Sequence, residues 1–377
     1  MKSRHLRRVA LLIIAMLIEW PCAAGTLVIA ASLNLELLKA QQRAEASGYI
    51  FFTSHNDIVD IAKKEGKLRV LVSQDQLVLK AVVTAFRKKY PFIDVSAEEV
   101  LGTESYQRTL QEIKTGLANM DVTYLNWDSY ADYVPYLKKF DVLGMAERGV
   151  LQIPPKMIDP IRRNVVAVSG AVGGMVYNRE IVSNEKVPNA VEDFLKPEFK
   201  GKKFALDVRS PALPALVPFW GLEKVLEIAR KLTAQDPIWF RGATRGVIIV
   251  SAGEAGLVYG INYKTWKRQQ KKDARKILDY KLMEPAPARL SEAESILNAA
   301  SNPHTGLLWL EFLAGPEGQK ILDQLDLAAS FLSPGSAHEQ IIRGKKLSVV
   351  DWEHFQKTGD YSMKIVEAMG FPRVEKR

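Results

Sequence analysis

Apolar residues follow two alternating spacings between residues 67 and 125, and no other feature of the sequence constrains the fold as strongly. Three segments have the pattern of buried or half-buried strands: 67–76 (KLRVLVSQDQ), 93–100 (IDVSAEEV) and 120–125 (MDVTYL). The two segments between them, 77–89 and 105–117, carry apolar residues at helical spacing. This repeated order of strand and helix predicts an α/β fold with a central, mostly parallel sheet flanked by helices.

The middle of the chain has shorter segments that glycines separate. Strands are predicted at 163–169, 174–177, 203–206, 247–250 and 256–259, and helices at 189–195, 221–232, 303–313 and 316–325. Gly170, Gly173 and Gly174 fall between the first two of these strands. Since glycine adopts backbone conformations that other residues avoid, the three glycines predict a hinge or a tight turn.

Composition excludes several classes of protein. Of the 377 residues, 47% are hydrophobic and 25% are charged, so the chain can bury a core. The single cysteine excludes a disulfide scaffold and a metal site built from cysteines. The net charge of +9 suggests an anionic ligand or surface. The basic stretch 267–276 has no interleaved aromatic residue, so we interpret it as a solvated helix face and expect no nucleic-acid partner.

The first 24 residues have the pattern of an export signal. Residues 1–8 carry four basic side chains, residues 9–18 form an unbroken apolar run, and Ala23 and Ala24 offer small residues to a signal peptidase. An apolar run of this length is too short to cross a bilayer core of about 30 Å. We therefore predict cleavage between about residues 22 and 31 and a periplasmic product, with a retained membrane anchor as the alternative.

No arrangement of residues typical of catalysis is present. The five histidines form no HExxH motif, and the chain contains neither a GxSxG nucleophile motif nor a phosphate-binding Walker A loop. The glycine-rich stretch at 170–174 lacks the GxGxxG spacing of dinucleotide-binding proteins. We therefore expect no enzyme activity, no catalytic residues, no resident cofactor and no metal site.

Polar and aromatic residues follow several predicted strands, where ligands of open α/β sheets bind. The predicted binding residues are Ser73, Thr103, Asn126 and Trp127 in the first half, and Asp207, Arg209, Ser210 and Tyr263 in the second. Trp127 and Tyr263 could wall a small-molecule pocket. Arg209 is the predicted main contact for an anionic ligand, and Arg289 offers a second fork-shaped donor. The alternative for Thr103 and Ser210 is a helix cap or a turn.

Eight segments, in order, resemble one group of proteins. They are AKKEGKLRVLVSQDQ (62–76), AFRKKYPFIDV (85–95), GTESYQRTLQEIKTG (102–116), MDVTYLNWDSY (120–130), GGMVYNRE (173–180), PNAVEDFLKPEFKGKKFALD (188–207), SAGEAGLVYG (251–260) and NPHTGLLWLEFLAGPEGQKIL (302–322). Together they resemble the solute-binding proteins of bacterial ABC transporters. The most similar branch is family 1 of the extracellular solute-binding proteins, with its ferric-iron, thiamine, polyamine and phosphonate binders.

The resemblance implies a two-lobed periplasmic-binding-protein fold of type II, with a two-strand hinge and the ligand in the cleft. Chain order then implies lobe one from 55 to 168 with 286–377 returning to it, and lobe two from 172 to 285. It also implies a monomer that closes on a small-molecule solute and docks on an ABC permease in the inner membrane.

The ligand stays open at this stage. Ferric-iron members of the family carry two adjacent tyrosines after the GE segment, whereas residues 260–264 read GINYK with one tyrosine. Fe(III) prefers several anionic oxygen ligands, so this departure favours a small organic or anionic solute. A ferric-iron binder, an exported enzyme on the same scaffold and an anchored sensor domain are the alternatives.

Overall fold

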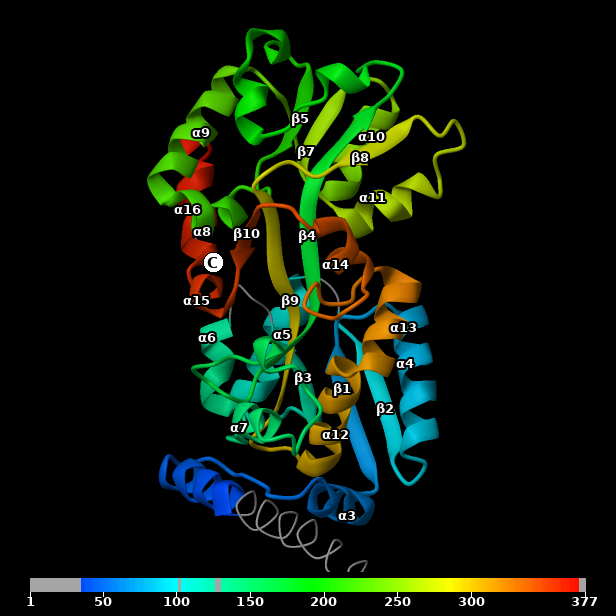
Figure 1. Cartoon of the computed structure of the whole chain (residues 1–377), viewed down its shortest axis with the longest axis vertical. Coiled ribbons are helices and arrows are strands. Elements are labelled where there is room, and N and C mark those ends of the chain that lie inside the picture. Colours follow the sequence, from blue (N-terminus) through cyan, green and yellow to red (C-terminus); the bar gives the residue numbers. More distant parts are fainter. Residues whose placement is uncertain (1–34, 101–102, 126–129, 373–377) are drawn as a thin grey trace, which may run out of the picture.

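The computed structural model describes residues 35–100, 103–125 and 130–372. Two lobes lie end to end along the long axis of the molecule, and strands β4 and β9 run between them (Figure 1). The predicted signal peptide, residues 1–24, lies outside the described residues. Within the described ranges, no helix is both long enough and apolar enough to cross a membrane. The two lobes confirm the two-lobed α/β architecture that the sequence predicts.

Lobe one is built on a parallel set of three strands. These are β1 (Lys67–Val72), β2 (Asp94–Glu99) and β3 (Val122–Leu125), and β1 pairs in parallel with the other two. Helix α4 (Gln76–Lys89) connects β1 to β2, and its N-cap Asp75 accepts hydrogen bonds from the Leu77 and Val78 amides. Its apolar face packs into a core that it shares with α12 (Pro303–Ala314), as the helical spacing predicts.

Lobe two repeats this arrangement with different strands. Strand β5 (Phe204–Asp207) pairs in parallel with β6 (Ile238–Phe240) and β7 (Leu257–Asn262), and β8 (Leu278–Lys281) pairs antiparallel with β4. The helices α9 (Leu222–Ala234), α10 (Ala243–Ser251) and α11 (Tyr263–Gln270) cover this sheet. The connections between its parallel strands contain helices, as parallel pairing requires.

Two long antiparallel strands join the lobes. Strand β4 (Val166–Asn178) pairs with β9 (Ala286–Ile296) through residues 166–172, and then with β7 and β8 of lobe two through residues 173–178. Strand β9 pairs with β3 in lobe one and in parallel with the short β10 (Leu347–Val350). Eight strands of the ten-stranded sheet follow the order β2-β1-β3-β9-β4-β7-β5-β6, while β10 pairs with β9 and β8 pairs with β4. The β4–β9 pair therefore joins the two lobes.

The remaining helices cover the two sheets (Figure 1). They are α3 (His55–Glu65), α5 (Thr103–Lys114), α6 (Tyr130–Tyr133), α7 (Val142–Glu147), α8 (Val217–Trp220), α13 (Pro316–Asp326), α14 (Ala337–Ile342), α15 (Trp352–Phe355) and α16 (Thr358–Ala368). Helix α16 lies beside α9, and Ile365 and Met369 join the lobe-two core. The last helix thus departs from the expected return of 286–377 to lobe one, because its apolar face completes the core around α9.

Two local predictions differ from the structure. The apolar run 247–250 lies inside helix α10 and is not a strand, because a short apolar run has no period that separates the two states. The predicted strands 163–169 and 174–177 are one continuous strand, β4, that includes the glycines. A Cβ on Gly170 would lie 2.8 Å from Phe331, and one on Gly174 would lie 2.6 Å from Tyr280. These glycines provide space for neighbouring rings and do not make a turn.

Candidate functional site

A cavity of about 360 Å³ lies where the crossing strands meet the facing ends of both lobes. Its lining residues are Ser73, Tyr106, Tyr124, Ser169, Gly170, Ala171, Asn262, Lys264, Thr265, Arg289, Ser291, Glu292 and His338. Most of these side chains end in hydroxyl, amide or charged groups. A concave site between two domains with convergent polar groups has the form of a small-molecule pocket.

Lobe one contributes hydroxyl groups to the cavity. Ser73 directly follows β1, and its buried Oγ has no hydrogen-bond partner among the described residues. Tyr106 of α5 and Tyr124 of β3 have ring centroids 5.2 Å apart with 39° between their planes. Burial raises the pKa of Tyr124 well above its ordinary value, so its hydroxyl keeps its proton at neutral pH. These groups can donate to or accept from a polar solute.

The crossing strands contribute charge and a strained residue. Ser291 Oγ of β9 donates to Ser169 Oγ of β4 at 3.3 Å, and Ser169 Oγ also donates to the Ala328 carbonyl. Glu292 has φ of 52° inside β9, a left-handed conformation that is rare for a residue other than glycine. Such strain clusters at functional sites, where the surrounding structure holds it in place. Arg289 lies on the same strand and also lines the cavity.

The Glu292 carboxyl is mostly buried beside two polar neighbours. Its side chain is 16% exposed, and Gln74 Nε2 donates to its Oε2 at 3.4 Å. Lys264 Nζ of lobe two lies 3.9 Å from Oε1. Burial raises the pKa of Glu292, and the charge of Lys264 offsets only part of this increase. The carboxyl is therefore a weaker acid than an exposed glutamate.

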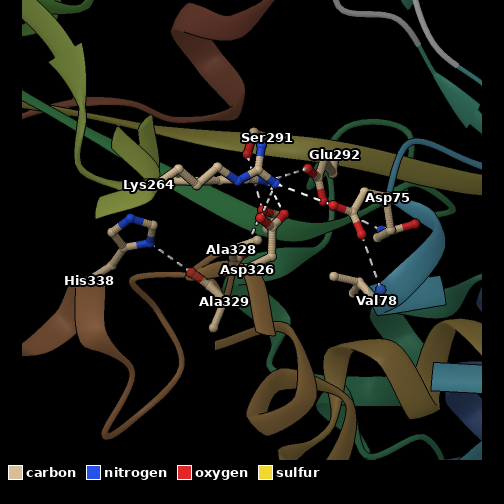
Figure 2. Close-up of polar contacts among 12 residues, drawn as sticks. Asp75, Val78, Lys264, Ser291, Glu292, Asp326, Ala328, Ala329 and His338 are labelled. Atoms are coloured by element: carbon tan, nitrogen blue, oxygen red, sulfur yellow. Dashed lines mark hydrogen bonds and ion pairs between the residues drawn. The ribbon is translucent and has the colours of Figure 1, made fainter. Parts of the chain in front are cut away.

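Ion pairs link the lobes next to the cavity (Figure 2). Asp326, at the end of α13 in lobe one, pairs with Lys264 and Arg268 of α11 in lobe two. Arg268 also lies 3.7 Å from Asp75, the N-cap of α4. The Asp326 side chain is 5% exposed, whereas that of Arg268 is 49% exposed. The observed arrangement of the lobes is thus one in which helix α11 contacts lobe one through opposite charges.

His338 of α14 completes the wall of the cavity. The residue is 1% exposed, its Nδ1 lies 3.0 Å from the Ala329 carbonyl oxygen, and its Nε2 has no hydrogen-bond partner among the described residues (Figure 2). Burial is the largest cause that lowers the pKa of His338, so the ring is neutral at neutral pH.

Of the residues predicted from the sequence to bind the ligand, Ser73 lines the cavity. Asn126 and Trp127 lie outside the described residues, as does the side chain of Thr103 at the start of α5. Tyr263 lies between two lining residues but packs against the rings of Trp266, Tyr280 and His338, with centroids 5.4–6.0 Å away.

The other three predicted residues, at the end of β5 and in the loop that follows it, do not line the cavity. Asp207 accepts hydrogen bonds from the amides of Arg209 and Gly242, both at 2.9 Å. Ser210 is buried and accepts from the Ala212 amide at 3.3 Å. Arg209 is exposed. Polar residues after a strand need not face a ligand, because Asp207 and Ser210 instead bind nearby backbone amides.

Several lining residues were missed, for different reasons. Tyr124 lies within a strand, whereas the predicted residues follow strand ends. Ser169 ends the predicted strand 163–169, but the glycines that follow it indicated a hinge. Lys264 directly follows the predicted Tyr263. His338 lies after the last predicted helix, and no local pattern connects it to a strand end. Arg289, predicted as a second donor for an anion, does line the cavity.

Comparison with known structures identifies the class of fold. Ferric iron-binding protein A of Mannheimia haemolytica, in an open conformation, superposes with a TM-score of 0.66 at 18% identity over 81% of this chain and 99% of that one. The substrate-binding protein of an ABC transporter from Agrobacterium tumefaciens gives 0.60 at 19% identity, over 82% and 96%. AfuA of Actinobacillus pleuropneumoniae, with bound fructose-6-phosphate, gives 0.56 at 20% identity, over 80% and 97%. The chain thus has the two-lobed fold of periplasmic binding proteins.

The sequence itself identifies the family. A family profile described as bacterial extracellular solute-binding protein matches residues 135–358, more than half of the chain. The chain therefore belongs to the bacterial extracellular solute-binding proteins, as the eight segments predicted. No curated protein has a significantly similar sequence.

Proposed function

We propose that this chain is the periplasmic solute-binding component of an ABC importer. In this proposal it acts as a monomer, captures a small anionic solute in the interlobe cavity and delivers it to a membrane permease. One observation carries the proposal: both lobes and both crossing strands contribute polar side chains to one cavity that is large enough for a small molecule. Membership of the family and the signal-like residues 1–24 support the periplasmic location.

The balance of charge in the cavity favours an anionic solute. Arg289 and Lys264 contribute two cations to the described lining, whereas Glu292 contributes the one carboxylate. Lys264 also pairs with Asp326 beside the cavity, and burial raises the pKa of Glu292. A planar guanidinium suits a carboxylate or phosphate group, which it can bind through two parallel hydrogen bonds. We therefore expect Arg289 to be the main contact for the acidic group of the solute.

The arrangement of the lobes supports binding by closure. Asp326 and Asp75 of lobe one lie opposite Lys264 and Arg268 of lobe two, so α11 can lock against lobe one when the lobes come together. In this proposal, residues 55–168 with the return from 286 move as lobe one, and residues 172–285 move as lobe two together with α16. Motion of this kind would turn about the β4–β9 pair.

Ferric iron is the second candidate ligand. Tyr106 and Tyr124 lie side by side in the cavity with the Glu292 carboxyl, so three oxygen ligands of the kind that Fe(III) prefers are near one another. Tyr106 and Tyr124 are not the sequence-adjacent pair of the ferric members. The two tyrosines near that place in the sequence point elsewhere, since Tyr259 is buried in the lobe-two core and Tyr263 packs on Trp266. To bind Fe(III), the tyrosine hydroxyls would have to lose their protons, and burial opposes this loss at Tyr124.

A thermal-shift experiment on the purified, metal-free mature protein tests the proposal. Its panel contains phosphate monoesters, small carboxylates, ferric citrate and polyamines. A ligand at 100 times its dissociation constant adds about 2.7 kcal/mol to the folded state. We expect stabilisation by the organic anions. Stabilisation by polyamines alone would contradict the anionic assignment, and a visible charge-transfer band with Fe(III) that Tyr124→Phe removes would establish iron as the ligand.

A further inference from the structure

The imidazole of His338 has a fixed tautomer. Its Nδ1 lies 3.0 Å from the Ala329 carbonyl oxygen, and a carbonyl oxygen can only accept a hydrogen bond. Nδ1 therefore carries the hydrogen. Burial lowers the pKa of the ring, so it holds no second proton at neutral pH. Nε2 is left as an acceptor with one free lone pair.

This acceptor is buried at the wall of the cavity and has no protein partner among the described residues. His338 is 1% exposed, lines the cavity, and Nε2 makes no hydrogen bond within the described chain. Buried polar atoms in native proteins nearly always have a partner, so an unsatisfied one that lines a binding cavity indicates the position of a ligand group. Ser73 Oγ, next to β1, is also buried without a partner among the described residues and belongs to a lining residue.

The partner of Nε2 must be a hydrogen-bond donor, since a neutral imidazole nitrogen with a lone pair only accepts. A fully ionised carboxylate or phosphate cannot fill this role, because its oxygens carry no hydrogen and only accept. The cavity therefore has two chemically different parts: the cations Arg289 and Lys264, which suit an acidic group, and His338 Nε2, which suits an O–H or N–H.

We infer that the solute carries a hydroxyl or amine beside its acidic group and donates that hydrogen to His338 Nε2. This inference rests on the proposed function and narrows it from small anions to hydroxylated or aminated anions, such as a hydroxy acid, an amino acid or a polyol phosphate. His338 is then a specificity-determining residue, because a solute without the donor would leave Nε2 buried without a partner.

Matched solutes test the inference on the mature wild-type protein by titration calorimetry. Succinate, malate and aspartate share a four-carbon dicarboxylate skeleton and differ by no donor, a hydroxyl or an amine. Propyl phosphate and glycerol 3-phosphate form a second pair that differs only in hydroxyls. In at least one of these sets, we expect the solute that carries a donor to bind at least tenfold more tightly than the solute without one. The affinities of malate and aspartate then show whether the donor is a hydroxyl or an amine.

Variants of His338 assign that difference to Nε2. His338→Asn keeps an amide donor for the Ala329 carbonyl and removes the acceptor, so it should reduce the preference for the donor-bearing solute to less than twofold. His338→Gln places an amide near the former Nε2 and should retain part of the preference. His354→Asn, at a histidine that contacts Asp351 outside the cavity, is the matched control and should leave the preference unchanged.

The outcomes separate this inference from the proposed function. If the anions bind but each set binds within twofold regardless of its donor, the inference fails while the anionic function stands. Equal weakening of both members by His338→Asn would also overturn it, because His338 would then only shape the cavity. If no anion of either set binds, the anionic assignment fails and the inference fails with it. If a His338 variant does not fold, the affinities of the wild-type protein for solutes with and without a donor still test the inference.

Discussion

The two lobes contribute unequally to the cavity between them. Lobe two supplies three of the lining residues in the described chain, Asn262, Lys264 and Thr265, all at the junction of β7 and α11. Lobe one and the crossing strands supply the rest, including Arg289, Glu292 and both tyrosines. The difference indicates that lobe one with the crossing strands forms a nearly complete polar surface, which the end of α11 then covers.

The residues that support the cavity lining also differ between the two lobes. Behind the lobe-one side, Gln74 Nε2 donates to Glu292 and to the fully buried Glu294, which also accepts from Trp309 Nε1. Behind the lobe-two side lie aromatic rings, with Trp266 stacked on Tyr280 at 5.1 Å and Tyr263 against both. Hydrogen-bonded acids are sensitive to pH and charge, whereas stacked rings are not. The stability of lobe one should therefore depend on pH and on charge substitutions more strongly than the stability of lobe two.

The largest expected effect is the dependence of stability on pH that Glu294 causes. Burial raises the pKa of this carboxyl from its ordinary value of 4.5 to about 8. Between about pH 4.5 and pH 8 the folded protein holds a proton that the unfolded chain releases, so stability falls as the pH rises through this window. Each unit of difference between the folded and unfolded pKa values is worth about 1.4 kcal/mol.

Glu294→Gln should remove the loss of folding stability that the ionisation of Glu294 causes at high pH. Urea unfolding at pH 5, 7 and 9 measures it, and the wild type should lose several kcal/mol more than the variant between the first and last pH. Glu292 remains in both proteins, and because the two carboxyls interact, the comparison measures the titration of Glu294 together with its coupling to Glu292. Parallel curves for wild type and variant would show that Glu294 is ionised in the folded protein.

The second prediction concerns the cationic contact in the cavity. Arg289→Ala should weaken binding of an anionic solute by roughly 10- to 150-fold, because a charge-assisted hydrogen bond is worth about 1.5–3 kcal/mol and each decade of affinity is about 1.4 kcal/mol. Arg209→Ala, at the exposed position that the sequence predicted, is the matched control and should bind as the wild type does. Titration calorimetry with the best anion of the thermal-shift panel measures both, and the reverse result would return the main contact to Arg209.

A third, smaller effect should separate stability from binding in lobe two. Asp207→Ala removes the acceptor of the Arg209 and Gly242 amides and should lower the free energy of unfolding by about 1–2 kcal/mol. Affinity for the solute should stay unchanged, because Asp207 does not line the cavity. Urea unfolding and calorimetry on the same preparation measure the two quantities. A loss of affinity without a loss of stability would place Asp207 in the binding site.

The smallest effect should come from the ion pairs that join the lobes. Arg268→Ala removes contacts with Asp326 and Asp75, but the Arg268 side chain is 49% exposed, and exposed pairs contribute about 0.2–1 kcal/mol. We expect affinity to fall at most about fivefold, with a larger radius of gyration in small-angle scattering of the unliganded protein.

Arg275→Ala provides the matched control for this ion pair, because Arg275 pairs with Glu180 within lobe two. It should change neither the affinity nor the radius. If both arginine variants behave alike, the contacts between the lobes do not influence closure.

Local patterns in the sequence predicted most of the elements but not the arrangement of the crossing. The strand and helix periods of 67–125 matched β1, α4, β2, α5 and β3. In β1, β2 and α4 one face is more buried and sets the period, whereas all four residues of β3 are buried. The prediction for 247–250 was wrong, since a short apolar run does not distinguish a strand from a helix and these residues belong to α10. Gly170 and Gly174 lie where β4 passes from β9 to β7, yet only the packed structure revealed that Phe331 and Tyr280 occupy the space beside them.

The sequence by itself determined the α/β class, the family and the strand ends near which the lobes face each other, because these depend on short-range periodicity and on segments that keep their order. The tertiary structure decided which side chains meet in the cavity. Ser73, Lys264, Glu292 and His338 lie far apart along the chain and come together only when two lobes and two crossing strands are assembled. Glu292 also lines the cavity with a left-handed backbone that no local pattern predicts, since the surrounding contacts hold it there.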